Sequence, residues 1–276
     1  MVSDWPLIAR EDELSWVLDA FAGTESGGVV IAGAAGVGKS RLAREVASTL
    51  ADGHAVEWVQ ASRAAASIPF GAFGQIVVLD DNHERGRLGL FNASAAALRT
   101  AAGERSLVIA IDDAHELDPG SAALALHLAT SRTAQLMVTV RSGERCEDAI
   151  TALWKDGHAR RLDLQALSEA EMQQLLESVL SAPLERETRD GIYHRCAGNP
   201  LFCRELVLGA LATGTLRLDD GLWRWQRRPI VSQRLTEVLA DRIATSSHPS
   251  STRWSTCRSD SRSRAPSWIG SRPGER

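Results

Sequence analysis

Lysine is almost missing from this 276-residue sequence. Only Lys39 and Lys155 are lysines, and the rest of the 31 Lys and Arg residues are arginines. Lysine is a compact point charge and arginine is a planar fork, so the two do not substitute freely for each other. A lysine inside a glycine-rich segment, at position 39, therefore indicates a chemical requirement. The net charge of −4 and the pI near 6.0 give no sign of a nucleic-acid surface or a polybasic membrane patch.

The sequence also lacks the patterns of metal-binding or disulfide-bonded cysteines. Its cysteines are Cys146, Cys196, Cys203 and Cys257, without a CxxC pair or a Cys/His cluster at zinc-site spacing. We expect free thiols in a reducing cytoplasm. The first residues show no basic segment followed by an apolar one, and no apolar run reaches membrane-spanning length. We therefore expect a cytoplasmic protein without a membrane partner.

Up to about residue 165, the sequence contains short apolar runs that alternate with helical patterns, which is typical of a parallel sheet covered by helices. The expected strands are residues 29–32, 54–60, 107–111, 135–140 and 161–164, and the expected helices are residues 40–50 and 121–130. We predict that residues 1–165 form an α/β domain with three layers, a parallel sheet with helices on both faces.

The pattern becomes helical after that point. Ser168 and Glu171 have the spacing of a capping box at the start of a helix. Further helices are expected at residues 186–197, 201–212 and 232–244, and a hairpin over 216–225 is expected to turn at Asp220-Gly221. We predict a helical subdomain over residues 166–245. Residues 246–276 hold ten Ser and six Arg but few apolar side chains, so we expect a disordered tail.

One motif follows the first expected strand and opens the helix after it. It fits the pattern GxxxxGK[ST] and consists of Gly33, Ala34, Ala35, Gly36, Val37, Gly38, Lys39 and Ser40. The glycines let backbone amides turn inward, and these amides form a phosphate nest with the helix N-terminus. Lys39 would neutralise phosphate oxygens, and the Ser40 hydroxyl would bind Mg²⁺. The motif predicts a P-loop that binds ATP with Mg²⁺; the alternative is a chance match.

The third expected strand ends in Asp112 and Asp113. Apolar residues followed by acid form the Walker B pattern, and the carboxyl end of such a strand opens on the crevice where ligands bind. We expect Asp112 to hold Mg²⁺ through water, together with Ser40. We expect Asp113 to activate the attacking water, with Glu116 as a second catalytic candidate. The alternative is that the acidic pair starts a loop and caps the next helix. His115 lacks partner ligands and is interpreted as a loop histidine.

Two further segments are candidates for the same site. Arg141 ends the fourth expected strand and could sense the γ-phosphate or stabilise charge in the transition state. The alternative is a surface arginine at a strand end. Gly198-Asn199-Pro200 lies between two expected helices, and its local pattern indicates an ordinary helix break, with a C-cap glycine and a proline that opens the next helix.

Together these segments resemble a known protein family. Residues 6–14 read PLIAREDEL and look like the opening GRE-x-EL of large ATP-binding LuxR-type (MalT-like) regulators, in the STAND class of signal-transduction NTPases. The P-loop, the acidic strand end, Arg141 and the Gly198-Asn199-Pro200 turn follow in family order. The resemblance implies that Arg10 borders the adenine pocket, that Arg141 is a sensor and that Pro200 packs near adenine. Ala9 departs from the glycine that is usual in the family.

The family pattern stops near Thr245. Relatives of this kind continue through a winged-helix unit and helical repeats to a helix-turn-helix, whereas this chain continues into the Ser/Arg-rich tail. We interpret the chain as truncated and the tail as out-of-frame sequence. Because no helix-turn-helix pattern is present, we expect no specific DNA binding.

Three functions agree with these features. The first is a switch module that binds ATP and slowly hydrolyses it to ADP and phosphate. The second is a P-loop small-molecule kinase, although no acceptor pocket or arginine-bearing lid is evident. The third is a nucleotide-binding remnant that signals nothing. The partners expected besides ATP are a second copy of the chain or full-length relatives.

Overall fold

The structure is a computed structural model, and it describes residues 5–23, 27–74, 76 and 86–226. The helix expected at residues 232–244 and the tail expected at residues 246–276 lie outside the described residues. Among the described residues, no helix combines the length and the apolar character needed to cross a membrane. Three of the expected free thiols, Cys146, Cys196 and Cys203, are free in this part of the chain.

Five parallel strands form the main sheet in the spatial order β2-β3-β4-β1-β5. They are β1 (Gly28–Gly33), β2 (His54–Gln60), β3 (Ser106–Asp112), β4 (Gln135–Arg141) and β5 (Arg160–Leu164). All five expected strands are therefore confirmed. In register, Gly33 lies opposite Arg141 and Gln60 lies opposite Asp112, so the strands end together at one edge of the sheet.

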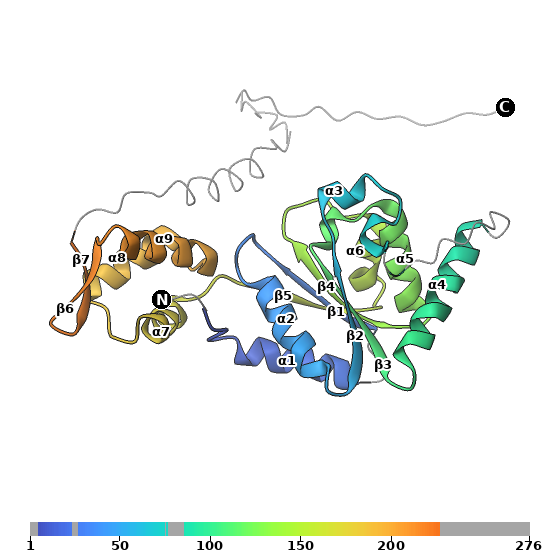
Figure 1. The fold of residues 1–276 in the computed structure, drawn as a ribbon, viewed down its shortest axis with the longest axis horizontal. Coiled ribbons are helices and arrows are strands. Elements are labelled where there is room, and N and C mark those ends of the chain that lie inside the picture. Colours follow the sequence, from blue (N-terminus) through green and yellow to red (C-terminus); the bar gives the residue numbers. More distant parts are fainter. Residues whose placement is uncertain (1–4, 24–26, 75, 77–85, 227–276) are drawn as a thin grey trace, which may run out of the picture.

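Helices cover both faces of this sheet, as Figure 1 shows. The helices of this part are α1 (Glu11–Ala22), α2 (Lys39–Leu50), α3 (Arg63–Ala66), α4 (Gly86–Ala102), α5 (Pro119–Thr130) and α6 (Asp148–Lys155), with the short 3-10 turns η1 (Gly71–Phe73) and η3 (Ala114–Glu116). Buried side chains of α1 and α2 pack on one face, and those of α4, α5 and α6 pack on the other. The predicted α/β fold with three layers is confirmed.

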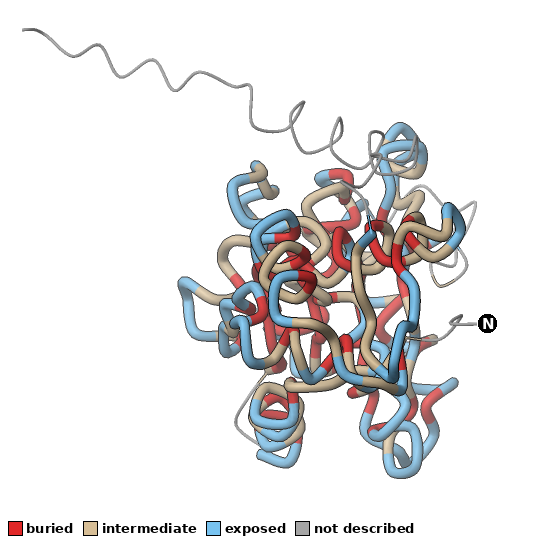
Figure 2. The backbone as a smooth tube through the Cα atoms, turned by 90° about the vertical axis from the view of Figure 1, so that its left-hand side faces the viewer, coloured by how far each residue is buried: buried red, intermediate tan, exposed pale blue. Residues whose placement is uncertain are grey.

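Both faces are buried at the centre of the sheet, because the central strands β3, β4 and β1 are apolar on both sides. Every residue of β1 is buried, and β4 is buried except at its two ends. Figure 2 shows the buried backbone running through the interior, with exposed segments around it. The sequence pattern predicts α2 and α5 but not α1, α3, α4 or α6. The helix expected at residues 121–130 starts at Pro119, because Asp118 caps it by accepting hydrogen bonds from Gly120 N and Ser121 N.

The helical unit follows β5 and has its own apolar cluster. It contains α7 (Glu169–Leu180), α8 (Arg186–Cys196), α9 (Pro200–Ala212), β6 (Leu216–Asp219) and β7 (Leu222–Trp225). The predicted capping box is confirmed: Ser168 Oγ accepts from Glu171 N, and the Glu171 carboxylate accepts from Ser168 N. The predicted hairpin is also confirmed, with Asp220 and Gly221 both at positive φ. The N-terminal segment reaches this unit, since Trp5 packs against its cluster.

Candidate functional site

The segment between β1 and α2 turns sharply at its glycines. Gly36 and Gly38 have φ values of +77° and +106°, a region that side chains other than glycine rarely adopt. Gly38 is the N-cap of α2, and no side chain caps the first amides of that helix. The Lys39 ammonium group donates a hydrogen bond to Ala34 O at 2.9 Å, which folds its side chain back over the loop. Burial lowers the pKa of Lys39, an effect that the nearby Asp113 carboxylate opposes.

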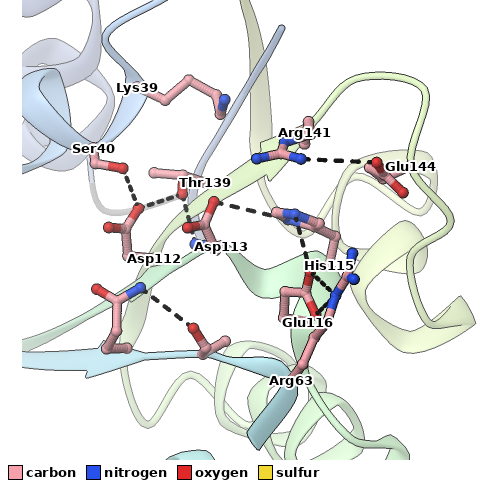
Figure 3. A network of polar contacts seen from close by, with 12 residues as sticks. Lys39, Ser40, Arg63, Asp112, Asp113, His115, Glu116, Thr139, Arg141 and Glu144 are labelled. Atoms are coloured by element: carbon pink, nitrogen blue, oxygen red, sulfur yellow. Dashed lines mark hydrogen bonds and ion pairs between the residues drawn. The ribbon is translucent and has the colours of Figure 1, made fainter. Parts of the chain in front are cut away.

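Three polar side chains meet at the start of α2, as Figure 3 shows. Ser40 Oγ donates to Asp112 Oδ1 at 2.7 Å, and Thr139 Oγ1 donates to the same oxygen at 2.6 Å. The other carboxylate oxygen lies 3.9 Å from the Arg44 guanidinium. Asp112 is only 3% exposed, so two hydroxyls and one cation compensate a buried charge. These contacts hold the Ser40 and Asp112 oxygens beside each other.

Asp113 is the first residue after β3 and has a different environment. Its backbone adopts φ +56°, and its amide donates to Thr139 Oγ1 at 2.9 Å. Its side chain is 39% exposed and lies 4.0 Å from His115 Nδ1. Burial lowers the pKa of His115, which favours the neutral imidazole. The same threonine therefore fixes both acidic residues, one by its hydroxyl hydrogen and the other by its oxygen lone pair.

Glu116 belongs to a second polar group behind His115 (Figure 3). Its carboxylate accepts from Arg63 Nε at 3.1 Å and 3.2 Å and lies 3.9 Å from His115 Nε2. Arg141, at the end of β4, has a looser partner, since its guanidinium lies 3.9 Å from Glu144. The structure thus pairs Glu116 with Arg63 and leaves Arg141 at the sheet edge, near Lys39 and Asp113.

A cleft of about 550 Å³ opens at this edge, between the sheet and the helical unit. Its walls comprise Trp5, Pro6, Leu7, Ile8, Arg10, Ala35, Gly36, Val37, Gly38, Lys39, Ser40, Arg41, Asp113, Arg141, Leu167, Leu175, Pro200, Leu201 and Arg204. The cleft brings together candidates that lie far apart in the sequence, among them Arg10, Arg141 and Pro200. Asp112 and Glu116 are not among the lining residues.

The N-terminal wall is held by Arg10, which is 6% exposed. Its guanidinium donates to Glu13 Oε1 at 2.6 Å and to Gln165 O at 2.5 Å, and so connects the segment before α1 to the end of β5. Ala9 beside it has φ +57°. A residue with a Cβ is strained in this region and glycine is not, which explains in physical terms why glycine would suit this position.

The wall from the helical unit centres on the turn between α8 and α9. Pro200 is the first helical residue of α9, as expected for a proline that opens a helix. A Cβ at Gly198 would lie 2.1 Å from Leu167 O, so this turn packs directly against the chain that leaves β5. Sequence reasoning missed Thr139, Asn199 and the cleft residues Trp5 and Arg204. The signal for Thr139 in the sequence is indirect: Asp112 and Asp113, which it contacts, end the preceding expected strand.

The chemistry of the site suits a phosphate ligand with a hard cation. Lys39 and the uncapped amides of α2 supply positive charge and N–H donors. The Ser40 hydroxyl and the Asp112 carboxylate are oxygen ligands of the kind that Mg²⁺ prefers. Across the described ranges, no group of three or more His, Cys, Asp or Glu side chains gathers into a separate metal site.

Comparison with known proteins agrees with this geometry. Residues 6–140, just under half of the chain, match the family model described as the AAA ATPase domain. No curated protein matches the chain in a sequence search. The matched segment includes the P-loop, both acidic residues at the end of β3 and all but the last residue of β4.

Solved structures share the fold at low sequence identity. The ORC1 protein of Aeropyrum pernix, solved in complex with DNA, has a TM-score of 0.55 at 16% identity, covering 87% of this chain and 66% of that chain. Cdc6p of Pyrobaculum aerophilum has a TM-score of 0.52 at 14% identity, covering 77% and 65% of the two chains. A STAND protein of Pyrococcus horikoshii with a tetratricopeptide repeat sensor has a TM-score of 0.50 at 17% identity, covering 87% of this chain but 33% of its own. The chain has the P-loop NTPase fold and spans only part of these structures.

Proposed function

We propose that this P-loop NTPase binds ATP with Mg²⁺ in the cleft at the carboxyl edge of the sheet and hydrolyses it slowly. The observation that carries the proposal is the 2.7 Å contact between Ser40 Oγ and Asp112 Oδ1. These oxygens belong to segments 72 residues apart, and they meet beside a loop whose lysine and amides suit phosphate. A structural role alone would not require a lysine and an uncapped helix N-terminus at the same place.

In this proposal each side chain has one task. The P-loop amides and Lys39 hold the phosphates, and Ser40 and Asp112 hold Mg²⁺, which would neutralise charge on the phosphate oxygens. Asp113, exposed to the cleft, orients and deprotonates water, and Arg141 stabilises negative charge as it develops. The pairing of Glu116 with Arg63 favours Asp113 for the first of these tasks. Arg10 and Pro200 form the walls for the base.

We also propose that the nucleotide acts on the position of the helical unit, in the manner of a signalling switch. The cleft is lined by residues of both parts of the molecule, residues 1–165 and 166–245, so a ligand there contacts both. The likeness to a STAND protein and the resemblance to LuxR-type regulators support this reading. A ligand shifts such an equilibrium only by its difference in affinity for the two arrangements.

The test is phosphate release by the purified full-length chain with Mg·ATP and no acceptor. Release above the rate of a Lys39→Ala control supports an ATPase and contradicts the kinase alternative. Tight ATP binding without release would instead leave a nucleotide-binding module without turnover. Limited proteolysis with and without Mg·ATP tests the switch, because unchanged cleavage of the helical unit would argue against it.

A further inference from the structure

One side chain of the helical unit is tied to the P-loop. Asn199 is 3% exposed, and its Oδ1 accepts hydrogen bonds from Leu201 N at 3.1 Å and Phe202 N at 3.3 Å, which caps α9. The nitrogen of the same amide donates to Ala35 O at 2.7 Å. An N-cap needs only the oxygen, so the second contact is not explained by capping.

The contact is extended by the backbone of α9. Leu201 N also donates to Gly36 O at 3.3 Å. A Cβ at Gly36 would lie 2.7 Å from Asn199 Oδ1 and 3.0 Å from the Leu201 Cβ, so the loop and the first turn of α9 touch with no space for a side chain. Two successive carbonyls of the P-loop are therefore held by the helical unit.

The geometry of the peptide bond gives these contacts a consequence for phosphate binding. In a trans peptide the carbonyl and the following N–H point to opposite sides. Holding the Ala35 carbonyl thus turns the Gly36 N–H away from Asn199, and holding the Gly36 carbonyl does the same for the Val37 N–H. Gly36 and Val37, the residues that carry these two N–H groups, are both among the residues that line the cleft.

We propose that Asn199 is a positioning residue for phosphate binding: it holds the Ala35 carbonyl and so presets the direction of P-loop amides. This inference rests on the proposed binding of ATP. Donors that are already oriented do not have to be ordered when the ligand arrives, and this increases affinity. The contact also makes the P-loop and the start of α9 one unit, so a ligand that orders the loop orders the turn between α8 and α9.

Asn199→Ser separates this role from capping. Serine caps a helix about as well as asparagine, but it has no amide nitrogen to reach the Ala35 carbonyl. In the full-length chain we expect the dissociation constant for Mg·ATP to rise about tenfold, the equivalent of about 1.4 kcal/mol. Inorganic tripolyphosphate, which has no base or sugar, should lose affinity by the same factor, because the loss falls on the phosphate nest.

Two variants serve as controls, with affinity measured by calorimetry and stability by thermal unfolding. Asn199→Ala should show the same loss of affinity with a lower unfolding midpoint than Asn199→Ser, because it also loses the cap. Ser168→Ala removes the cap of α7 in the same unit without touching the P-loop, and should lower stability at unchanged affinity.

Wild-type affinity of Asn199→Ser for both ligands would overturn the inference. A loss confined to ATP, with tripolyphosphate unaffected, would also overturn it, because the side chain would then act on the base. If the wild-type chain bound neither ligand, the proposed function would fail and this inference with it.

Discussion

The two acidic residues at the end of β3 are neighbours in the sequence and differ in nearly every contact. Asp112 is 3% exposed and accepts hydrogen bonds from two hydroxyls at 2.7 Å and 2.6 Å. The Asp113 side chain is 39% exposed, and its carboxylate lies 4.0 Å from Nδ1 of the His115 imidazole. One carboxylate is fixed inside the protein, and the other faces the cleft.

The difference shows how one strand end can serve two purposes. Asp112 is the last residue of β3, whereas Asp113 has a positive φ and begins the turn that follows the strand. The buried side is assembled by β3, β4 and α2, which carry Asp112, Thr139 and Ser40. The open side keeps an acceptor for water or ligand. This difference agrees with the proposal that Asp112 holds the metal and Asp113 acts on water.

The largest effect should come from Lys39, whose ammonium group interacts electrostatically with both Asp112 and Asp113. Lys39→Ala removes the ammonium group from the loop and should weaken binding of Mg·ATP by about 100-fold or more, the loss of charge-assisted hydrogen bonds to phosphate. Titration with a fluorescent ATP analogue measures this loss. Far-UV circular dichroism should match that of the wild-type chain. Retained affinity would contradict the site.

Asp113→Asn should distinguish the role of Asp113 from that of Asp112. The amide cannot take a proton from water, so we expect phosphate release to fall by about 100-fold, within the range for loss of a general base. The affinity for Mg·ATP and the unfolding midpoint should change little, because the side chain is exposed. Unchanged phosphate release would remove Asp113 from its assigned role.

Asp112→Asn is the matched variant on the buried side. It should weaken the Mg²⁺-dependent part of ATP binding and lower stability, since Ser40, Thr139 and Arg44 all lose a charged acceptor. The comparison fails if both Asn variants behave alike in calorimetry with and without Mg²⁺.

Thr139→Val should lower the stability of the fold more than it lowers the rate of phosphate release. The substitution keeps the shape of the side chain but removes the hydroxyl that donates to Asp112 and accepts from the Asp113 amide. Loss of a hydrogen bond to a buried charge should lower the free energy of unfolding by about 2 kcal/mol. Urea unfolding measures it, and Thr130→Val, at an exposed helix position, is the control. Equal stability of the two variants would contradict the role of Thr139.

The smallest effect concerns pH. Burial lowers the pKa of His115 below its usual 6.5, so the folded chain binds fewer protons there than the unfolded chain. The free energy of unfolding should therefore decrease as pH falls through about 6.5 toward the lower pKa of the folded state. His115→Gln should show a weaker decrease over that window in urea unfolding. An unchanged pH profile would contradict a buried neutral imidazole.

The sequence predicted those features that depend on local pattern. Apolar runs and alternating patterns predicted the five strands, and the GxxxxGK[ST] motif predicted the P-loop, because each requires only neighbouring residues. The strand order could not be predicted in this way, since the position of β4 between β3 and β1 depends on pairing between distant segments. The helix α4 was missed because two of its first four residues, Gly86 and Gly89, are glycines with low helix propensity.

The residues of the candidate site likewise fall into those predicted from local motifs and those recognised only in the fold. Lys39, Ser40 and Asp112 belong to motifs and were predicted together. Thr139 was not, because in sequence it is a threonine within an apolar strand, and its hydroxyl gains meaning only beside β3. Asn199 was interpreted as part of a helix break, and its side-chain oxygen does cap the helix that begins there. Its nitrogen contacts a loop 164 residues away, a contact that only the fold reveals.

Calorimetric titration of the folded full-length chain with ATP, in the presence and absence of Mg²⁺, tests the central claim most directly. We predict saturable binding at a ratio of one ATP per chain, strengthened by Mg²⁺ and lost in Lys39→Ala. A folded chain that releases no heat and shows no shift in its unfolding temperature with Mg·ATP would contradict the assignment of this cleft to a nucleotide.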